Sequence, residues 1–313
     1  METTVLKTTA ENRENWLSNR QGKIGGSTIA AILGLDERRT PVDVWMDLTG
    51  KSSREKADNK ATMRGQMMEQ TVANFFEMET GLKIIQSSDG HEMYIHPTFD
   101  YLVASPDRRY WKEDGTKGVL ECKTTRYMVS EIPEKWFVQL MWYIGFLAYE
   151  HGTIGWFEFP TESFQHQQFT FNKEFFDFLI GEAIEFHDRY IKTDTPPPIV
   201  KAKDVDRLFR KHVTGKVAIL PDEMIQSHYV DYVRLSGEIR EREAKLEALK
   251  DELKLLCRDA EAIENDGTIL FTFKASKESM RFDTDAFAKS HPDLFSKFMR
   301  PTAGQRKFLV KAK

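Results

Sequence analysis

The sequence is poor in cysteine, with only Cys122 and Cys257 among 313 residues. Two cysteines cannot form a disulfide framework, and these two do not have the spacing of a zinc site. The sequence also lacks any run of about 18 consecutive apolar residues, the length that a membrane-spanning helix needs. Its first residues, METTVLKTTA, contain no apolar stretch typical of a secretion signal. These absences predict a soluble protein of a reducing cytoplasm and exclude a membrane protein.

A surplus of basic residues is missing as well. The formal net charge is −4, whereas proteins that bind nucleic acids usually carry a clear positive surplus. The charge is unevenly distributed, however, because the segment from Asp266 to the C-terminus contains ten Lys and Arg against five Asp and Glu. A basic tail therefore follows an acidic body, and a bound cation could offset part of the acidity of that body.

Proline is scarce, but three prolines are consecutive, from Pro196 to Pro198. Because proline has no amide proton and a fixed φ angle, this run cannot lie inside a helix or a central strand, and it predicts a domain boundary. Before it, helix-like and strand-like patterns alternate, which predicts an α/β or α+β domain around a central sheet, spanning residues 1–194. The expected helices are 27–33, 41–49, 61–80 and 133–150, and the expected strands are 101–105, 119–124 and 153–159.

A linker is expected at 195–221 and a C-terminal domain at 222–313. Apolar residues at a 4-3 spacing run through 225–263, interrupted by His228 and Arg242, and predict one long helix with a heptad seam. The seam would pack either on its own domain or against another chain as a coiled coil. Asn265-Asp266-Gly267 is expected to end this helix, and short strands are expected at 269–274, 279–283 and 307–311 around a last helical stretch.

The residues that suggest chemistry are Asp107, which follows Ser-Pro, and the triplet Glu121-Cys-Lys123. Alternate side chains of a strand emerge on one face, so Glu121 and Lys123 would share a face about 7 Å apart. The Asp114-Gly115 pair between the two motifs signals a hairpin turn. A loop with an odd number of residues, such as three with Gly115 left-handed, would set Asp107 directly opposite Glu121. A two-residue loop would place Asp107 on the other face.

We expect the odd loop, and therefore two carboxylates whose Cβ atoms lie within about 5 Å. Two like charges this close repel strongly unless a cation lies between them. Oxygen ligands suit Mg²⁺ or Mn²⁺ better than zinc, and one or two such ions could activate water and polarise a phosphate oxygen. Lys123 would orient the water or offset developing charge. The competing interpretation is a solvated ion pair on an edge strand, because Glu-x-Lys also recurs at Glu243 and Glu252.

Ser105-Pro106-Asp107 with Glu121-Cys122-Lys123 resembles the motif of the PD-(D/E)xK nuclease superfamily. Further segments are similar to the YqaJ-type viral recombinases and the bacteriophage lambda exonuclease family. The sequence departs from the family pattern at Arg109, because members often have Gly-Leu after Pro-Asp. The further segments are 16–34 with Arg20 and Gly25-Gly26-Ser27, 63–69 ending in Glu69, Gln139-Leu-Met-Trp-Tyr143, and a tail at 268–311 that the smaller lambda enzyme lacks.

The resemblance implies a restriction-endonuclease-like fold, in which helices flank a central mixed sheet, and a C-terminal domain with a long helix and a small sheet. From the residues alone, Ser27 could equally be a helix cap with Arg20 solvated, Glu69 a surface residue and Gln139 a side chain satisfied by backbone. The implied catalytic residues are Asp107, Glu121, Lys123, Glu69 and Gln139. The implied metal ligands are Asp107, Glu121, Glu69 and the backbone carbonyl of Cys122, and the implied 5′-phosphate or DNA contacts are Arg20, Ser27 and Tyr143.

The implied activity is Mg²⁺-dependent (or Mn²⁺-dependent) digestion of one strand, 5′ to 3′, at double-stranded DNA ends. The 3′ single-strand overhangs would serve a single-strand annealing protein, with a single-strand binding protein and further copies of the chain as other partners. If a phage encodes the protein, its location would be the host cytoplasm. Two other functions stay open: a structure-selective endonuclease, and a catalytically silent DNA-binding or assembly protein on the same fold.

Overall fold

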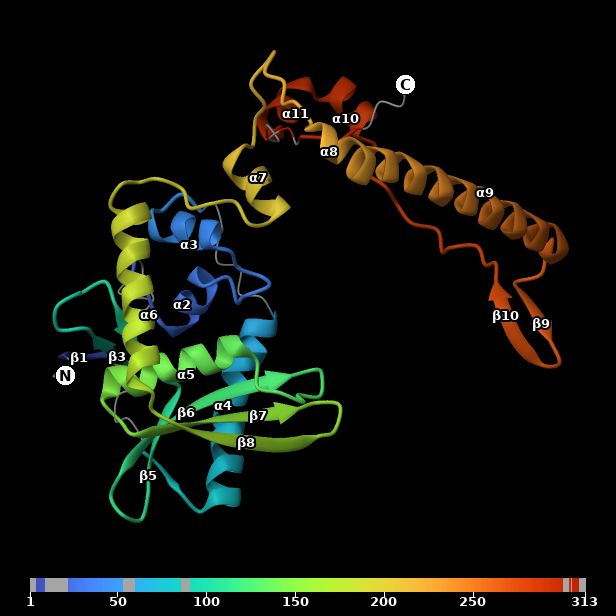
Figure 1. Cartoon of the computed structure of the whole chain (residues 1–313). Helices are drawn as coiled ribbons and strands as arrows, with labels where there is room; N and C mark the ends of the chain where they lie inside the picture. Colours follow the sequence, from blue (N-terminus) through green and yellow to red (C-terminus); the bar gives the residue numbers. More distant parts are fainter. Residues whose placement is uncertain are drawn as a thin grey trace. The chain divides into compact units, whose positions relative to one another are not determined.

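The computed structural model describes residues 4–8, 22–52, 60–85, 91–300, 304 and 306–309. The chain divides into two compact units, unit 1 (Met1–Leu208) and unit 2 (Phe209–Lys313) (Figure 1). The boundary between the units falls inside the segment 195–221 that the sequence marks as a linker.

The central sheet of unit 1 consists, in spatial order, of β2 (Lys83–Ile85), β5 (Arg108–Trp111), β6 (Lys117–Thr125), β7 (His151–Glu158) and β8 (Ser163–Thr170). The chain passes from β6 to its parallel neighbour β7 through helix α5 (Glu134–Leu147), whereas the other neighbouring strands are antiparallel. The expected fold class, a mixed central sheet flanked by helices, is therefore confirmed.

Helices cover both faces of this sheet, with α5 on one face and α4 (Lys60–Thr80) on the other (Figure 1). Strand β6 contributes side chains to two clusters of buried apolar residues, one on each face of the sheet. Val119 packs into the cluster that includes α5, whereas Leu120 packs with Phe76 of α4. Because the pleat alternates side chains between faces, Glu121 and Lys123 lie on the α5 face with Val119. The charged residues of the triplet thus meet α5 rather than α4.

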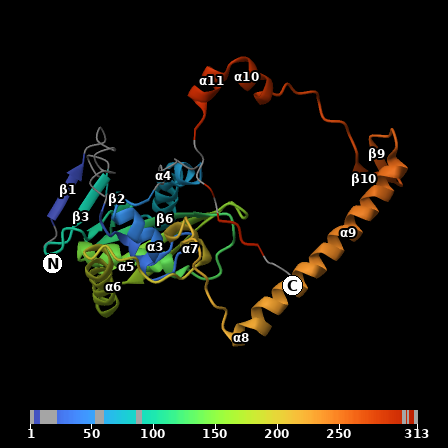
Figure 2. The same ribbon diagram turned by 90° about the horizontal axis from the view of Figure 1, so that it is seen from above.

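A layer of helices lies outside α5 and completes the larger core: α2 (Gly26–Ile32), α3 (Pro41–Leu48) and α6 (Lys173–Phe186). Helix α6 contacts α5 and crosses it at a steep angle, so that in Figure 2 it is seen nearly end-on next to α5. Helix α3 starts where its sequence predicts, because Pro41 occupies the first turn and Thr40 and Asp43 form a capping box. Neither α6 nor β8 is among the elements expected from the sequence. β8 carries exposed polar residues at 165–168 and so lacks the apolar alternation of a strand.

A smaller sheet consists of β1 (Thr4–Thr8), β3 (His91–Ile95) and β4 (Val103–Ala104). The strand expected at 101–105 belongs here and not to the central sheet. The two sheets are linked by an ion pair, because Arg109 of β5 lies 2.7 Å from Glu92 of β3, whose carboxylate also accepts a 2.7 Å hydrogen bond from the Tyr94 hydroxyl. Arg109, the residue at which the chain departs from the family pattern, therefore joins the sheets.

Helix α7 (Ala202–Leu208) lies within the segment expected to be a linker, yet it packs on unit 1. Asp204 is fully buried and accepts a 2.6 Å hydrogen bond from the hydroxyl of Thr40, the N-cap of α3. Lys203 lies 3.2 Å from Asp43, and Arg207 pairs with the same carboxylate. Contacts that are distant in sequence hold this helix, which is why its local pattern did not reveal it.

Unit 2 contains the expected long helix, followed by a hairpin and two short helices. Helix α8 (Asp222–Met224) and the π-helix η3 (Ile225–Val230) lead into α9 (Asp231–Cys257). The helix was expected to continue to 263, but it ends at Cys257, where Arg258 takes a positive φ of 48°. Next come β9 (Ala262–Asn265), β10 (Thr268–Thr272), α10 (Thr284–Ser290) and α11 (Pro292–Phe298).

Three expectations for unit 2 were wrong. Asn265-Asp266-Gly267 does not end the helix; Asp266 and Gly267, with φ of 46° and 76°, form the two-residue turn of the β9-β10 hairpin. Residues 279–283 form no strand, and neither do 307–309, while 310 and 311 lie outside the described residues. Within the described residues, neither stretch pairs with a neighbouring strand through backbone hydrogen bonds, and a local pattern typical of a strand is not sufficient to form one. Among the described residues, no helix combines the length and apolar character needed to cross a membrane.

Candidate functional site

The β5-β6 hairpin has the register that the sequence predicts. Arg108 pairs with Leu120 and Arg109 with Val119. The loop is the expected three-residue form: the amide of Lys112 donates to the carbonyl of Thr116 at 2.8 Å, and Gly115 takes a φ of +83°. Continued by one residue, this register sets Asp107 opposite Glu121, so the two carboxylates approach each other at the start of β5.

Glu121 is fully buried on the α5 face of β6. Its Oε1 accepts a 2.5 Å hydrogen bond from the Lys123 ammonium, whereas its Oε2 has no hydrogen-bond partner within the described part of the chain. Burial and the nearby Asp107 carboxylate raise the pKa of Glu121 to about 8, despite the opposing influence of Lys123. A buried carboxylate with one unsatisfied oxygen is costly by itself, and a cation at that oxygen would remove the cost.

Lys123 is held by two acceptors. Besides Glu121, its Nζ donates to Oε1 of Gln139 in α5 at 2.9 Å. Burial alone would lower the pKa of Lys123, but the charges of Glu121 and Asp107 outweigh burial and raise it. Gln139 in turn donates to the hydroxyl of Tyr143 at 3.0 Å, one helical turn further along. The sequence predicted that Gln139 needs a polar partner in an apolar helix, and Lys123 is that partner.

Asp107 is fixed by the backbone of the neighbouring strand, because its Oδ2 accepts a 2.8 Å hydrogen bond from the Cys122 amide. The side chain of Cys122 points to the opposite face and packs with Leu120 and Phe76. Burial raises the pKa of its thiol well above the usual value. The thiol is therefore no candidate ligand, and only the backbone carbonyl expected from the resemblance could serve.

Glu69 is not brought into one ligand group with Asp107 and Glu121. It projects from α4, the helix on the other face of the sheet, and its Oε2 lies 3.8 Å from the Arg108 guanidinium. Among the described residues, no three His, Cys, Asp or Glu side chains lie close enough together to hold a metal ion. After burial and Asp107, the Glu69 carboxylate also contributes to the raised pKa of Glu121, yet it lies beside Arg108, and its part as a metal ligand stays a prediction.

The remaining donors nevertheless fit a divalent cation. Asp107 and Glu121 supply carboxylate oxygens, and the unpaired Oε2 of Glu121 is the buried atom that most needs a positive partner. An ion held by two carboxylates and a backbone carbonyl, with water in the other positions, corresponds to the all-oxygen coordination of Mg²⁺ or Mn²⁺. The donor set therefore suits a hard cation rather than zinc.

Sequence reasoning did not single out Arg108, which lies beside the carboxylates. Its guanidinium donates to the carbonyl of Asp107 at 2.6 Å and to Oε1 of Gln70 at 3.4 Å. The hairpin register places it on the face of β5 opposite to Asp107, toward α4. The hairpin register, which the sequence predicts, was the signal from which this position of Arg108 could have been predicted.

Of the residues expected to bind the 5′-phosphate or DNA, two lie in the described part of the chain: Ser27 in α2 and Tyr143 in α5. Arg20 lies outside the described residues. Ser27 is exposed in the first turn of α2, but Gly25 is the N-cap and no side chain caps the helix, so the alternative that Ser27 is the cap is wrong. A Cβ atom on Gly26 would lie 2.9 Å from Cε1 of Tyr143, so glycine is needed where α2 meets α5. Tyr143 is only 2 % exposed and lies behind Gln139.

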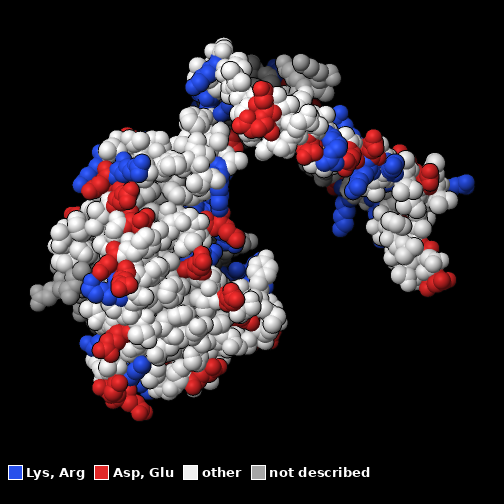
Figure 3. Space-filling model, viewed as in Figure 1, with Lys and Arg blue, Asp and Glu red and all other residues white. Residues whose placement is uncertain are grey.

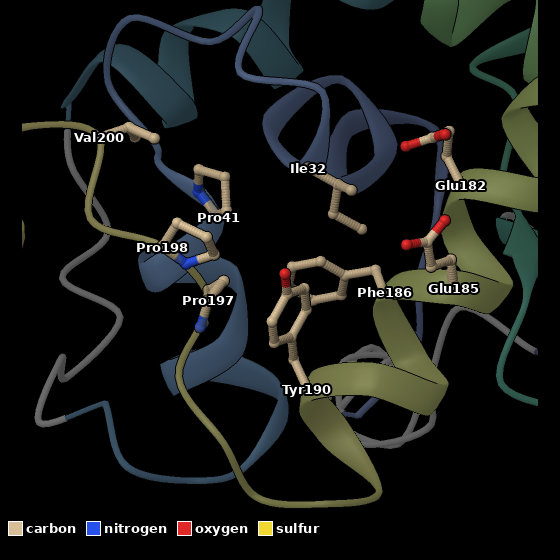
Figure 4. A pocket seen from close by; sticks show the side chains of 9 residues that line it. All are labelled: Ile32, Pro41, Glu182, Glu185, Phe186, Tyr190, Pro197, Pro198 and Val200. Carbon is tan, nitrogen blue, oxygen red and sulfur yellow. The ribbon is translucent and has the colours of Figure 1, made fainter.

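A separate pocket of about 240 Å³ lies between α2, α3, α6 and the proline run (Figure 4). Its walls include Pro41, Pro197 and Pro198, and Glu182 and Glu185 lie together on the side formed by α6. None of the site residues expected from the sequence lines this pocket. The candidate site on the hairpin therefore lies elsewhere in unit 1.

Comparison with known proteins agrees with the motif residues. Residues 15–146 match the family model of the YqaJ-like viral recombinase domain. The chain is also 26 % identical to the uncharacterized protein YqaJ of Bacillus subtilis, over 96 % of this chain and 95 % of that protein. Because the second match extends through unit 2, the similarity is not confined to the domain that carries the motifs.

Two solved exonuclease structures are similar to part of the chain. The alkaline exonuclease LHK-Exo from Laribacter hongkongensis has a TM-score of 0.47 and 16 % identity, over 58 % of this chain and 97 % of that one. A phage related exonuclease from Haemophilus somnus has a TM-score of 0.40 and 14 % identity, over 57 % of this chain and 100 % of that one. The match to the family model agrees with the resemblance that the motifs indicate: residues 15–146 are similar to the YqaJ-like viral recombinase domain.

Proposed function

We propose that the chain is a metal-dependent deoxyribonuclease that digests one strand of double-stranded DNA from the 5′ end. The observation that carries the proposal is the buried Glu121, with its unpaired Oε2, beside Asp107 and next to a lysine that is itself held in place. The similarity of residues 15–146 to the YqaJ-like viral recombinase domain supports a nuclease over other metal-dependent hydrolases.

Asp107, Glu121 and the backbone carbonyl of Cys122 would hold one or two Mg²⁺ or Mn²⁺ ions. A bound ion of this kind polarises a phosphate oxygen and makes a bound water a stronger nucleophile. The Cys122 amide holds Asp107 in position for this role through a 2.8 Å hydrogen bond. Glu69 would contribute from α4 only when its carboxylate leaves Arg108, so we assign it a secondary part.

Lys123 would orient the attacking water and offset the negative charge that develops on the phosphate. Its ammonium has two fixed acceptors, Glu121 at 2.5 Å and Gln139 at 2.9 Å, which leave one of its three protons for water or phosphate. Gln139 is a positioning residue, and Tyr143 fixes the Gln139 amide at 3.0 Å. Tyr143 is too deeply buried to be a direct DNA contact and would act through Gln139.

In this proposal, the terminal 5′-phosphate is the group by which the protein recognises the DNA end. Arg20 and Ser27 are the residues proposed for it, from their resemblance to the family signature. Ser27 is exposed, and its helix packs against α5 at the position of Tyr143, on the same side of the sheet as Lys123. The product would be a 3′ single-strand overhang. A single-strand annealing protein and a single-strand binding protein are the proposed partners for that product.

The direct test is a linear duplex with a 5′-phosphate, incubated with Mg²⁺ beside a covalently closed circle of the same sequence. The proposal expects stepwise release of nucleotides from the 5′-phosphorylated strand and an intact circle. Cleavage of the circle would support the endonuclease alternative instead. Binding of DNA without any hydrolysis in Mg²⁺ or Mn²⁺ would support the catalytically silent alternative.

The variant Lys123→Ala tests the chemical role of the lysine. Hydrolysis should fall at least ~10²-fold while affinity for the duplex changes little, the scale of losing one transition-state contact. The matched control is Lys173→Ala, which also removes a lysine from an ion pair, here with Asp177 on the surface. An unchanged rate in Lys123→Ala would remove Lys123 from the mechanism.

A further inference from the structure

Six apolar residues of the α9 seam are exposed, and the seam residue Leu253 is half-buried. Side chains that repeat at heptad spacing are between 47 and 74 % exposed, although they are the residues that a helix normally buries. Figure 3 shows Lys and Arg alternating with Asp and Glu along the visible side of the same helix. The seam residues with these exposures are Tyr232, Leu235, Ile239, Leu246, Leu249 and Leu256.

We propose that α9 is a dimerisation helix, which pairs with α9 of a second copy of this chain as an antiparallel coiled coil. In the proposed register, Leu246 lies opposite Leu249 of the second copy, and Ile239 lies opposite its Leu256. The two-fold axis repeats each of these contacts, so the interface is self-complementary. The proposal is independent of the nuclease activity assigned to unit 1.

The charges that flank the seam select the antiparallel orientation. In a parallel pair, the flanking positions would set Glu238 beside Glu243 and Lys245 beside Lys250 of the second copy, and like charges so placed repel. In the proposed antiparallel register, Lys245 lies beside Glu252 and Glu243 beside Lys250. Each attractive pair occurs twice by symmetry, whereas the parallel arrangement offers only repulsive ones at these positions.

The same charges fix the register. A shift by one heptad toward the N-terminus would set Lys245 beside Lys245 of the second copy and Glu238 beside Glu252. A shift in the other direction would set Glu252 beside Glu252 and Lys250 beside Lys250. Both neighbouring registers therefore replace attraction by repulsion, and such flanking charges set partner and orientation in coiled coils.

Two features of the helix fit this arrangement. Arg242 interrupts the apolar seam and would lie opposite Leu253, where its aliphatic stem covers apolar surface while its guanidinium reaches water. Lys250 already pairs with Glu247 on its own helix at 3.0 Å, but both side chains are more than half exposed. Exposed pairs of this kind contribute little, so Lys250 can exchange this partner for Glu243 of the second copy at small cost.

The heptad phase is continuous only within α9, and the end of the helix at Cys257 limits the contact. Upstream, the π-helix η3 changes the number of residues per turn and breaks the heptad phase. Downstream, the helix ends at Cys257. In the proposed register, residues 238–257 of the two copies overlap, which is about 30 Å of paired helix at 1.5 Å per residue. The contact is short, so we expect a reversible dimer.

Sedimentation equilibrium of the full chain tests the proposal. The wild-type chain should be in a monomer-dimer equilibrium. Lys245→Glu should weaken dimerisation about ten-fold, because it sets a second carboxylate beside Glu252 at two symmetric places. The double variant Lys245→Glu/Glu252→Lys should restore wild-type affinity. Arg240→Glu is the matched control, a charge reversal on the same helix but outside the seam, and should leave the dimer unchanged.

The direction of the effect makes the test decisive. In a parallel dimer, Lys245→Glu would set the new carboxylate beside Lys250 and strengthen association, which would overturn the proposed orientation. A monomeric wild-type chain at tens of micromolar, or a dimer insensitive to Lys245→Glu, would overturn the proposal altogether. Circular dichroism of each variant checks that helix content is retained. Because mass is measured rather than hydrolysis, an inactive enzyme would leave this result unaffected.

Discussion

The Lys123 ammonium lies 2.9 Å from the side-chain oxygen of Gln139, which joins the middle strand of the sheet to the helix that follows it. Strand β6 directs the Lys123 side chain to the α5 face. The hydrogen bond from Gln139 to Tyr143 fixes the orientation of the Gln139 amide, whose oxygen accepts the hydrogen bond from Lys123. A lysine on a strand by itself would have a mobile ammonium. Here its direction is determined by the βαβ crossover, so the geometry of the site depends on the packing of α5.

Gln139→Ala should therefore lower kcat about ten-fold while leaving KM for duplex DNA nearly unchanged, because the ammonium loses one of its two fixed acceptors. Steady-state hydrolysis of a 5′-phosphorylated duplex measures both constants. Gln167→Ala, at an exposed position of β8, is the control for a lost glutamine side chain. A large rise in KM with kcat unchanged would assign Gln139 to DNA binding instead.

The raised pKa of Glu121 predicts how the stability of the metal-free protein depends on pH. The folded state holds a proton on Glu121 up to about pH 8, whereas the unfolded chain releases it near the usual pKa of 4.5. Stability should therefore decrease as pH rises between these values, by at most about 1.4 kcal/mol per pH unit. Thermal unfolding from pH 5 to 9 measures the slope.

Glu121→Gln should flatten that slope, because the buried group can no longer ionise. Mg²⁺ should raise the Tm of the wild-type protein most at high pH, where the carboxylate is charged and needs a cation, and should have little effect on Glu121→Gln. If Mg²⁺ stabilises the two proteins equally at pH 8, then Glu121 is not a ligand.

Gly26→Ala should destabilise the fold by about 1 to 3 kcal/mol, because the new methyl group meets the Tyr143 ring at 2.9 Å and Gln139 Cγ at 3.0 Å. Hydrolysis should fall as well, since those two residues position Lys123. Gly65→Ala in α4 is the matched control: nothing lies within 4 Å of its added Cβ, and it should stabilise the helix by about 0.5 to 1 kcal/mol. Urea unfolding of both variants compares them; equal stability would contradict the close approach of α2 and α5.

Arg109→Ala should lower the free energy of unfolding by about 1 to 3 kcal/mol. The substitution removes the cation from the Glu92 carboxylate, whose side chain is only 13 % exposed. A double-mutant cycle with Glu92→Gln should give a coupling of about 1 kcal/mol. Metal-dependent hydrolysis should persist in the folded fraction, since Arg109 joins the two sheets and does not touch the carboxylates. Additive effects of the two substitutions would show that the ion pair does not form.

The hairpin that carries the site could be predicted from the sequence because its determinants are local. Asp114-Gly115 fixes the loop, Gly115 supplies the left-handed conformation, and strand alternation then sets Asp107 opposite Glu121. The Gln139-Tyr143 pair followed from helical spacing for the same reason. The heptad pattern likewise predicted α9, although the end of that helix depended on the backbone of Arg258.

What the sequence could not decide depends on which elements meet. The sequence places Glu69 on an amphipathic helix, but only the packing of α4 on the other face of the sheet sets it against Arg108. Helix α7 exists because Asp204 meets Thr40, a contact between residues far apart in the chain. Local patterns determine which side chains share a face, since backbone geometry fixes that over a few residues, whereas partners across the fold are decided by how the buried apolar faces fit together.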